Sequence, residues 1–319
     1  MLIVNDLKTC FNVGEETVTA VDGISFQVEP KKVVGLVGES GSGKSVTALS
    51  ILNLLPNNGN IVNGSVLWKD MDIVSMPKQR LREIRGKEIG LIFQNPLASL
   101  NPVFTIGNQM VETIIQHNNV SKKSAKEMAV ELLKKVNMPD PEQRFHAYPH
   151  QLSLGMCQRV MIAMTLSMKP QLLIADEPTA SLDVTIQAQI LDLLTQLKTD
   201  FNMSVLFISH DLGVVAQYCD EILVMYLGKI VEKGSVRQIF SNPLHPYTQA
   251  LLSSIPVPDP DQKKTQIILK GDIPSPLHIP KGCRFHPRCP KAFDQCRKQH
   301  PELKPKPFDS EHETACFLY

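Results

Sequence analysis

Eight residues near the N-terminus have the types and the spacing of a loop that binds a polyphosphate. The pattern is G-x-x-x-x-G-K-S, formed by Gly38, Glu39, Ser40, Gly41, Ser42, Gly43, Lys44 and Ser45. Glycine lets backbone N–H groups close around phosphate oxygens. The lysine of such a loop reaches the β- and γ-phosphates, and the serine hydroxyl is a ligand for Mg²⁺. The loop is therefore expected to hold a nucleoside triphosphate with its magnesium ion.

A strand and a helix must flank this loop for the pattern to have that meaning. Residues 32–37 form a short apolar run that is typical of a buried strand. Residues 46–55 are apolar at helical spacing, and Pro56 ends the helix. The strand, the turn and the helix therefore follow each other in the required order.

Two adjacent carboxylates, Asp176 and Glu177, end a second apolar run at 171–175. Parallel sheets bind their ligands at the carboxyl ends of the strands. We expect Asp176 to hold Mg²⁺, either directly or through water. Glu177 is placed to polarise the attacking water as a general base.

Strands and helices alternate along most of the chain, which predicts an α/β fold with a mostly parallel sheet and helices on both faces. Residues 1–31 are expected to form strands that turn at Asp22-Gly23. Residues from about 95 to 165 form a helical insertion with a capping box from Ser124 to Glu127. Prolines crowd the chain beyond residue 241, so we expect a main domain at 1–241 and a small irregular extension at 242–319.

The composition is that of a folded globular protein. The chain has 319 residues, of which 43% are hydrophobic and 20% charged, and its net charge is +1. This charge gives no reason to expect a nucleic-acid partner. We find neither a signal peptide nor an apolar run near the roughly 18–20 residues of a membrane helix, and therefore expect a cytoplasmic protein that docks on a membrane protein.

The motifs together resemble those of ATP-binding-cassette (ABC) ATPases. Residues 176–183, D-E-P-T-A-S-L-D, resemble the Walker B motif and D-loop of that family, and the other motifs follow in order over residues 1 to about 240. The resemblance implies a P-loop NTPase cassette with a RecA-like core, an antiparallel β subdomain and a helical subdomain. It also implies hydrolysis of ATP to ADP and phosphate.

The same resemblance implies roles for three further residues. Phe11 matches the aromatic residue that stacks on adenine. Gln94 matches the Q-loop glutamine, which senses the γ-phosphate, takes part in the Mg²⁺ site and faces the transport subunits. His210 matches the switch histidine of the catalytic site.

In ABC dimers, the signature and D-loop of one chain act on the ATP held by the partner, which here would involve Ser153, Gly155 and Asp183. The signature departs from the family pattern because Leu154 replaces a glycine and Cys157 replaces an arginine. A leucine adds bulk and resists positive φ. We therefore expect an asymmetric heterodimer in which the partner's site is weakened. A largely non-catalytic assembly subunit is the alternative.

Three further segments resemble the oligopeptide/dipeptide branch of ABC importers, which also includes nickel importers. They are the H-P-Y-T stretch within 242–252, and residues 95–102 and 282–290. The resemblance implies a peripheral ATPase subunit at the cytoplasmic face of the membrane that powers peptide import. Its implied partners are two transmembrane permease subunits, a second and different ATPase, and an extracytoplasmic solute-binding protein. Nickel, haem or another small solute is an alternative cargo, and a soluble ABC ATPase of the repair or translation type is the rival from another class.

Four of the seven cysteines, Cys283, Cys289, Cys296 and Cys316, follow the spacing C-x5-C-x6-C-x19-C. This is not the spacing of a zinc ribbon. Four thiolates can hold a [4Fe–4S] cluster, and the resemblance also implies a structural cluster of this kind. Zn²⁺, with His286 or His312 as a further ligand, and the absence of any metal are the alternatives. Basic residues surround the motif and are expected to offset the negative charge of a cluster: Arg284, Arg288, Lys291, Arg297 and Lys298.

Overall fold

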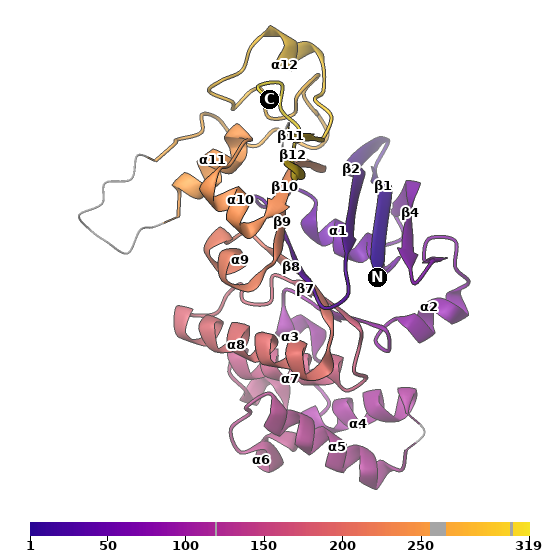
Figure 1. Ribbon diagram of the computed structural model, residues 1–319. Helices are drawn as coiled ribbons and strands as arrows, with labels where there is room; N and C mark the ends of the chain where they lie inside the picture. Colours follow the sequence, from indigo (N-terminus) through magenta and orange to yellow (C-terminus); the bar gives the residue numbers. More distant parts are fainter. Residues whose placement is uncertain (119, 256–265, 307–308) are drawn as a thin grey trace, which may run out of the picture. The chain divides into compact units, whose positions relative to one another are not determined.

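The computed structural model describes residues 1–118, 120–255, 266–306 and 309–319 (Figure 1). These residues divide into two compact units, Met1–Met76 with Phe207–Tyr319, and Pro77–Leu206. The C-terminal segment thus belongs to the same unit as the phosphate loop. Our domain boundary at 241/242 is a different division and stays a prediction. Four of the crowded prolines lie outside the described residues: Pro256, Pro258, Pro260 and Pro307.

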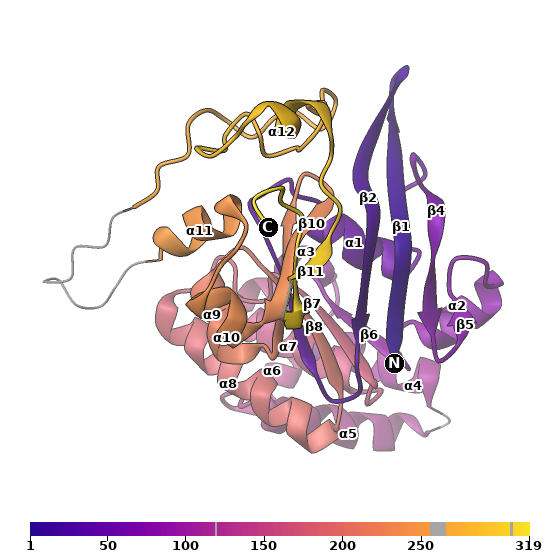
Figure 2. The same cartoon turned by 45° about the horizontal axis from the view of Figure 1, so that its top comes forward.

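An antiparallel sheet opens the first unit. Strand β1 (Leu2–Val13) lies between β2 (Glu16–Val28) and β4 (Gly59–Trp68), and β5 (Met71–Asp72) pairs with β4 (Figure 2). The turn that we predict at Asp22-Gly23 is wrong, because β2 continues through it. Gly23, with φ +68°, is instead the extra residue of a β-bulge.

The phosphate loop follows the buried strand β3 (Val33–Val37). This strand pairs in parallel with β9 (Glu221–Tyr226), and β9 forms a hairpin with β10 (Lys229–Ser235) through a turn at Leu227-Gly228. The C-terminal strands β12 (Asp309–Thr314) and β11 (Lys304–Lys306) extend the sheet beyond β10. The end of the chain therefore adds strands to the sheet that carries the phosphate loop.

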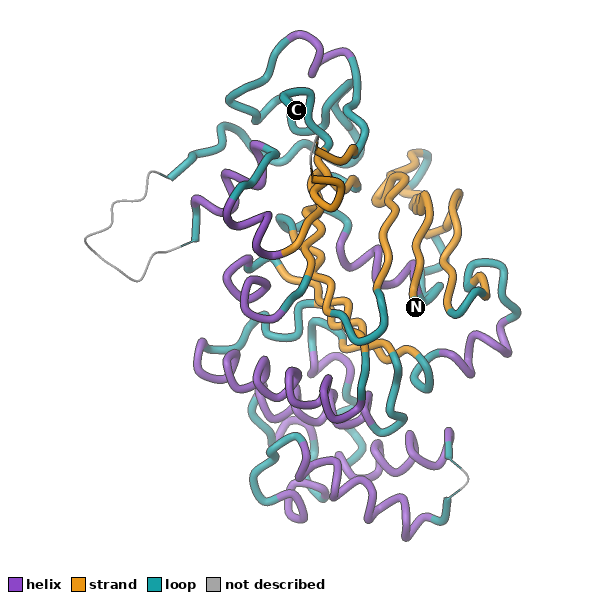
Figure 3. The backbone as a smooth tube through the Cα atoms, viewed as in Figure 1, coloured by secondary structure: helices purple, strands orange, loops and turns teal. Residues whose placement is uncertain are grey.

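Short helices and loops complete this unit. Helix α1 contacts the antiparallel sheet, where Ser50 and Thr9 share a buried hydrogen bond of 2.8 Å. The C-terminal segment is mostly loop (Figure 3). The helices are α1 (Lys44–Ile51), α9 (Leu212–Tyr218), α10 (Val236–Ser241), α11 (Pro246–Ser253) and α12 (Asp294–Lys298). Strand β8 (Ser204–Ser209) contains the boundary between the two units.

The second unit contains two parallel strands, β6 (Ile89–Ile92) and β7 (Leu172–Asp176), and a largely helical segment between them. Helix α5 packs against α4, α6 and α7 (Figure 1). The helical elements are α2 (Lys78–Ile84), α3 (Pro96–Ser99), α4 (Ile106–His117), α5 (Lys122–Lys135), α6 (Pro141–Phe145), the 3₁₀ turn η1 (Pro149–Gln151), α7 (Leu154–Leu166) and α8 (Val184–Phe201).

The helix α5 starts one turn earlier than the sequence suggests. Its N-cap is Ser121, whose hydroxyl accepts a hydrogen bond of 3.2 Å from the N–H of Ser124. The capping box that we predict from Ser124 to Glu127 is therefore wrong, because Ser124 is inside the helix and its own N–H is capped by Ser121.

No helix among the described residues has both the length and the apolar composition required to cross a bilayer.

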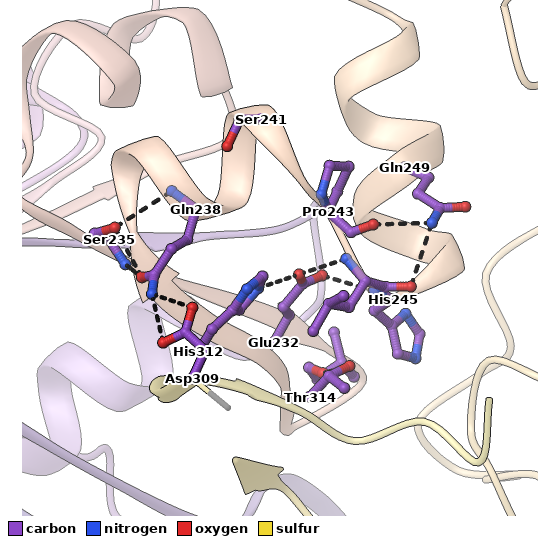
Figure 4. A network of polar contacts seen from close by, with 12 residues as sticks. Glu232, Ser235, Gln238, Ser241, Pro243, His245, Gln249, Asp309, His312 and Thr314 are labelled. Carbon is purple, nitrogen blue, oxygen red and sulfur yellow. Dashed lines mark hydrogen bonds and ion pairs between the residues drawn. The ribbon is translucent and has the colours of Figure 1, made fainter. Parts of the chain in front are cut away.

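A buried carboxylate joins the C-terminal segment to the sheet (Figure 4). Glu232 on β10 is fully buried and accepts hydrogen bonds from the N–H groups of Leu244 and His245 at 2.7 and 2.9 Å. Its Oε1 also lies 2.8 Å from Nε2 of the buried His312 on β12. A buried charge is stable only when such partners surround it. Glu232 therefore holds the start of α11 and the last strand together.

We expect Glu232→Gln to destabilise the first unit by about 3 kcal/mol, because the amide offers one acceptor oxygen where the carboxylate offers two, and its NH₂ group would face buried N–H donors. Urea denaturation measures the change in the free energy of unfolding. Glu221→Gln is the matched control, since Glu221 contacts Lys233 at 3.6 Å near the surface and should cost less than about 1 kcal/mol. Equal effects of the two substitutions would contradict this account.

Candidate active site

The backbone of the phosphate loop lies so close to its neighbours that two positions have no room for a side chain. A Cβ at Gly38 would lie 2.2 Å from the carbonyl oxygen of Met225, and one at Gly43 would lie 2.5 Å from that of Ala20. Gly43 also has φ +108°, which disfavours any L-residue. Gly38 and Gly43 are therefore required by the packing of the loop.

Lys44 and Ser45 are the first two residues of α1, with Gly43 as N-cap. The N-terminus of a helix is a favourable place for an anion. The Lys44 side chain is buried, and its Nζ donates hydrogen bonds to the carbonyl oxygens of Gly38 and Glu39 at 2.8 and 3.0 Å. The loop thus fixes the position of the ammonium group that is expected to reach a polyphosphate.

Two other predicted site residues belong to the same unit. Phe11 on β1 pairs with Gly59, and its ring covers that glycine so closely that a Cβ there would lie 2.6 Å from it. His210 follows β8 and is exposed. Their roles toward adenine and the γ-phosphate stay predictions.

In the second unit, the structure brings Gln94 and Glu177 together. The Gln94 side chain, just after β6, donates a hydrogen bond of 3.0 Å from Nε2 to Oε2 of Glu177. Asp176 ends β7 and is only 8% exposed, as expected for a residue at the carboxyl end of a strand. Glu177 has φ +47°, an unusual conformation that turns the chain directly after the strand.

The signature residues start α7, and the D-loop residue starts α8. Ser153 and Asp183 are the N-caps of these helices, and their side chains accept hydrogen bonds from Met156 and Ile186 at 3.3 and 3.0 Å. Gly155 lies against α8, where a Cβ would be 2.9 Å from Ile186 Cγ2. These contacts hold the starts of the two helices together.

Leu154 is the first residue of α7 and is absent from the residues with positive φ. One argument against a leucine here is therefore wrong, because the backbone does not require the freedom of glycine. What remains of the argument is the added bulk of the side chain. Cys157 is buried with its Sγ 3.6 Å from the carbonyl oxygen of Pro149, and burial raises the pKa of its thiol.

The four C-terminal cysteines, 283, 289, 296 and 316, line one small cavity together with His245 and His286. None of these cysteines forms a disulfide. Burial raises the pKa of the Cys283 thiol to about 11. However, no group of three or more histidine, cysteine, aspartate or glutamate side chains in the described part of the chain has the geometry of a metal site. His312, a candidate zinc ligand, contacts Glu232 instead.

Two of the arginines that we expect around a cluster have other partners. Arg284 donates hydrogen bonds to the Leu227 carbonyl oxygen and to Asp22. Arg288 pairs with Glu39 of the phosphate loop, a contact that the sequence did not reveal. The N–H of Glu39 also donates to the hydroxyl of Tyr247, in the H-P-Y-T stretch. The H-P-Y-T pattern marked this stretch as distinctive in the sequence, but it did not indicate a contact with the phosphate loop.

A family model described as "ABC transporter" matches residues 21–180, which is half of the chain. The chain belongs to the ABC transporter family. It is an ATPase with the ABC cassette fold that the sequence predicts. A second family model, "Oligopeptide/dipeptide transporter, C-terminal region", matches residues 231–296.

Two relatives of this ABC ATPase match it over most of both chains. The oligopeptide transport ATP-binding protein AppD of Bacillus subtilis is 51% identical, over 100% of this chain and 97% of the relative. The oligopeptide transport ATP-binding protein OppD of Salmonella typhimurium is 45% identical, over 94% of this chain and 89% of the relative.

Solved structures of ATP-binding cassettes have the same fold. A dimeric, post-hydrolysis state of the cassette MJ0796 bound to ADP and Pi has a TM-score of 0.67 and 26% identity, over 74% of this chain and 99% of that chain. The structure of cbiO1 from Clostridium perfringens, part of the transporter complex cbiONQ, has a TM-score of 0.64 and 27% identity, over 76% and 90%.

Proposed function

We propose that this ATPase powers the import of di- and oligopeptides through a membrane ABC transporter. The observation that carries the proposal is that one chain contains both the ABC cassette and the C-terminal region of oligopeptide/dipeptide transporters. The names of the relatives agree with it. The chain would lie at the cytoplasmic face of the membrane, on two permease subunits that receive the cargo from an extracytoplasmic solute-binding protein.

The residues of the site suggest how each would act on ATP. The loop from Gly38 to Ser45 would hold the phosphates with backbone N–H groups and the Lys44 ammonium, and Phe11 would stack on adenine. Ser45, Asp176 and Gln94 would complete the Mg²⁺ site.

Glu177 would accept a proton from the attacking water, and His210 would contact the γ-phosphate. The hydrogen bond from Gln94 fixes the orientation of the Glu177 carboxylate and supports its assignment as the general base. Because ATP would bind best to the closed dimer, hydrolysis would allow that dimer to reopen.

We expect Glu177→Gln to keep ATP binding and to reduce kcat by at least about 100-fold, since the amide cannot accept the proton of the attacking water. Hydrolysis and uptake of a labelled oligopeptide are measured in the transporter reconstituted with its permeases. Glu142→Gln, at an exposed position on α6 of the same unit, is the control and should hydrolyse ATP normally. Normal hydrolysis by Glu177→Gln would refute the assigned base, and uptake of nickel but not peptides would refute the cargo.

We also propose that this chain pairs with a second, different ATPase subunit, on whose ATP Ser153, Gly155 and Asp183 would act. The side chain of Leu154 stands at the start of α7, where a helix N-terminus would approach the γ-phosphate. Its bulk would weaken the partner's site, whereas the phosphate loop of this chain keeps its full set of residues.

Leu154→Gly is expected to increase ATP turnover of the assembled pair at least twofold, because it removes side-chain bulk from the partner's site. Steady-state hydrolysis of the complete complex measures this effect, with the partner's own phosphate-loop lysine replaced in a second sample. The increase should disappear in that sample. An unchanged rate in the first sample counts against the proposal.

The cysteine cavity is the third part of the proposal. We propose that Cys283, Cys289, Cys296 and Cys316 hold a structural [4Fe–4S] cluster, for which their soft thiolate donors are suited. Their convergence on one cavity supports it. Burial raises the pKa of the Cys283 and Cys316 thiols, so cluster binding would release protons that these thiols otherwise keep.

Anaerobic purification should give a brown protein that absorbs near 400 nm and contains iron and sulfide. Replacing Cys289 by Ser is expected to abolish the colour, whereas replacing the remote Cys10 by Ser should leave it unchanged. A colourless protein with stoichiometric zinc, or with no metal at all, would reject the cluster.

A further inference from the structure

A salt bridge connects residues 283–296, which we call the cysteine segment, to the phosphate loop. Arg288, between Cys283 and Cys289 in the direction of the chain, places NH1 2.7 Å from Oε2 of Glu39 and NH2 3.1 Å from Oε1. We propose that Arg288 is a positioning residue for ATP binding, because it fixes the conformation and neutralises the charge of Glu39. This role goes beyond the proposed function and does not depend on whether the four cysteines hold a metal.

Glu39 is held through each of its polar groups. Arg288 binds its carboxylate through two parallel hydrogen bonds, a geometry that is strong and directional. The hydroxyl of Tyr247 on α11 accepts a hydrogen bond of 2.9 Å from its N–H. Its carbonyl oxygen accepts the Lys44 ammonium at 3.0 Å. A shift of Glu39 would therefore move the oxygen to which Lys44 is bonded.

The charge of Glu39 gives Arg288 a second effect. An anionic side chain in a loop that must hold a polyphosphate repels the ligand, and its side chain is only 28% exposed, so water screens it incompletely. The Arg288 side chain is 8% exposed, and its bonds to Glu39 raise the pKa of its guanidinium. Arg288 is thus a permanent cation that cancels this repulsion.

Arg288 is itself held by rigid packing. Phe285 is buried against Tyr226 and Tyr247, with ring centroids 5.2 and 5.4 Å apart. The N–H of Arg288 donates to the carbonyl oxygen of Phe285 at 3.0 Å, and the guanidinium lies 6.0 Å from the centre of the Tyr226 ring. The direction of the Arg288 side chain therefore follows from the packing of the cysteine segment.

The neighbouring Arg284 holds the same segment against the turn at Leu227-Gly228, which contacts the phosphate loop at Ser42. It bonds to the carbonyl oxygen of Leu227, and the next residue, Gly228, donates its N–H to the Ser42 carbonyl oxygen at 2.8 Å. Burial lowers the pKa of Arg284, and the charge of Asp22 opposes this effect. Arg284 thus anchors the segment through Asp22, whereas Arg288 forms its ion pair with a side chain of the phosphate loop.

The test is binding of a non-hydrolysable ATP analogue with Mg²⁺ to the full-length chain. Arg288→Met keeps much of the side chain but leaves the Glu39 carboxylate without its cation, and should weaken binding about 10-fold. The double variant Arg288→Met/Glu39→Gln removes the repelling charge as well. It should bind within about threefold of the original chain, because loss of both partners costs less than loss of one.

Arg297→Met is the matched control, since Arg297 is exposed in the same segment and should bind the analogue normally. Restored binding in the double variant is the readout that a purely structural role would not give. The proposal is overturned if Arg288→Met binds normally, or if the double variant binds no better than Arg288→Met. If Arg288→Met does not fold, Arg288→Lys decides: it keeps the charge, loses one of two bonds, and should bind about threefold more weakly at an unchanged Tm.

Discussion

The main constraint on the first unit is that the phosphate loop must present backbone, not side chains, to its ligand. Gly38 and Gly43 lie within van der Waals distance of the backbone of β9 and β2, so neither position accepts even a methyl group. Both neighbouring strands must therefore keep their positions beside the loop. The turn between β9 and β10 bonds to the loop through the N–H of Gly228, and the C-terminal segment contacts that turn through Arg284 and the loop through Arg288. The energetic reason is general, because a loop that is already ordered loses less entropy when it binds.

The second unit meets a different requirement, which is to orient charges. Its strand β7 is wholly apolar until Asp176, and the chain then turns through the left-handed conformation at Glu177. Such a conformation in a non-glycine residue costs roughly 1–3 kcal/mol and persists only when its surroundings fix it. Here Gln94 bonds to the Glu177 side chain, the N–H of Ala180 donates to the Glu177 carbonyl oxygen at 3.1 Å, and the N-cap at Asp183 follows within one short loop. The strained backbone and the oriented carboxylate are thus both features of Glu177.

The sequence predicted the features that follow from local patterns. The phosphate loop with its flanking strand and helix, and the strand before Asp176, have strong short-range signals in residue type and spacing. The errors arose where two local signals competed. Asp22-Gly23 is a good turn and also a good bulge, and only pairing with β1 decides between them.

Long-range contacts were not predictable from one sequence. Arg288 and Glu39 are 249 positions apart, and no periodicity connects them. Arg288 therefore resembled a counter-charge for its neighbouring cysteines. The packing of Phe285 is what directs it to the phosphate loop instead. Likewise, the partner of His312 became evident only once β12 was placed beside β10.

The pairing of β12 with β10 also has a consequence for the behaviour of the protein in a crowded solution. An unpaired strand edge is a template for the edges of other molecules and so promotes aggregation. Here β12 covers part of β10, and the outermost strand β11 reads Lys304-Pro305-Lys306. Three residues, two of them cations and one without an N–H group, offer a poor surface for further strands. The C-terminal segment therefore also ends the sheet in a form that resists self-association.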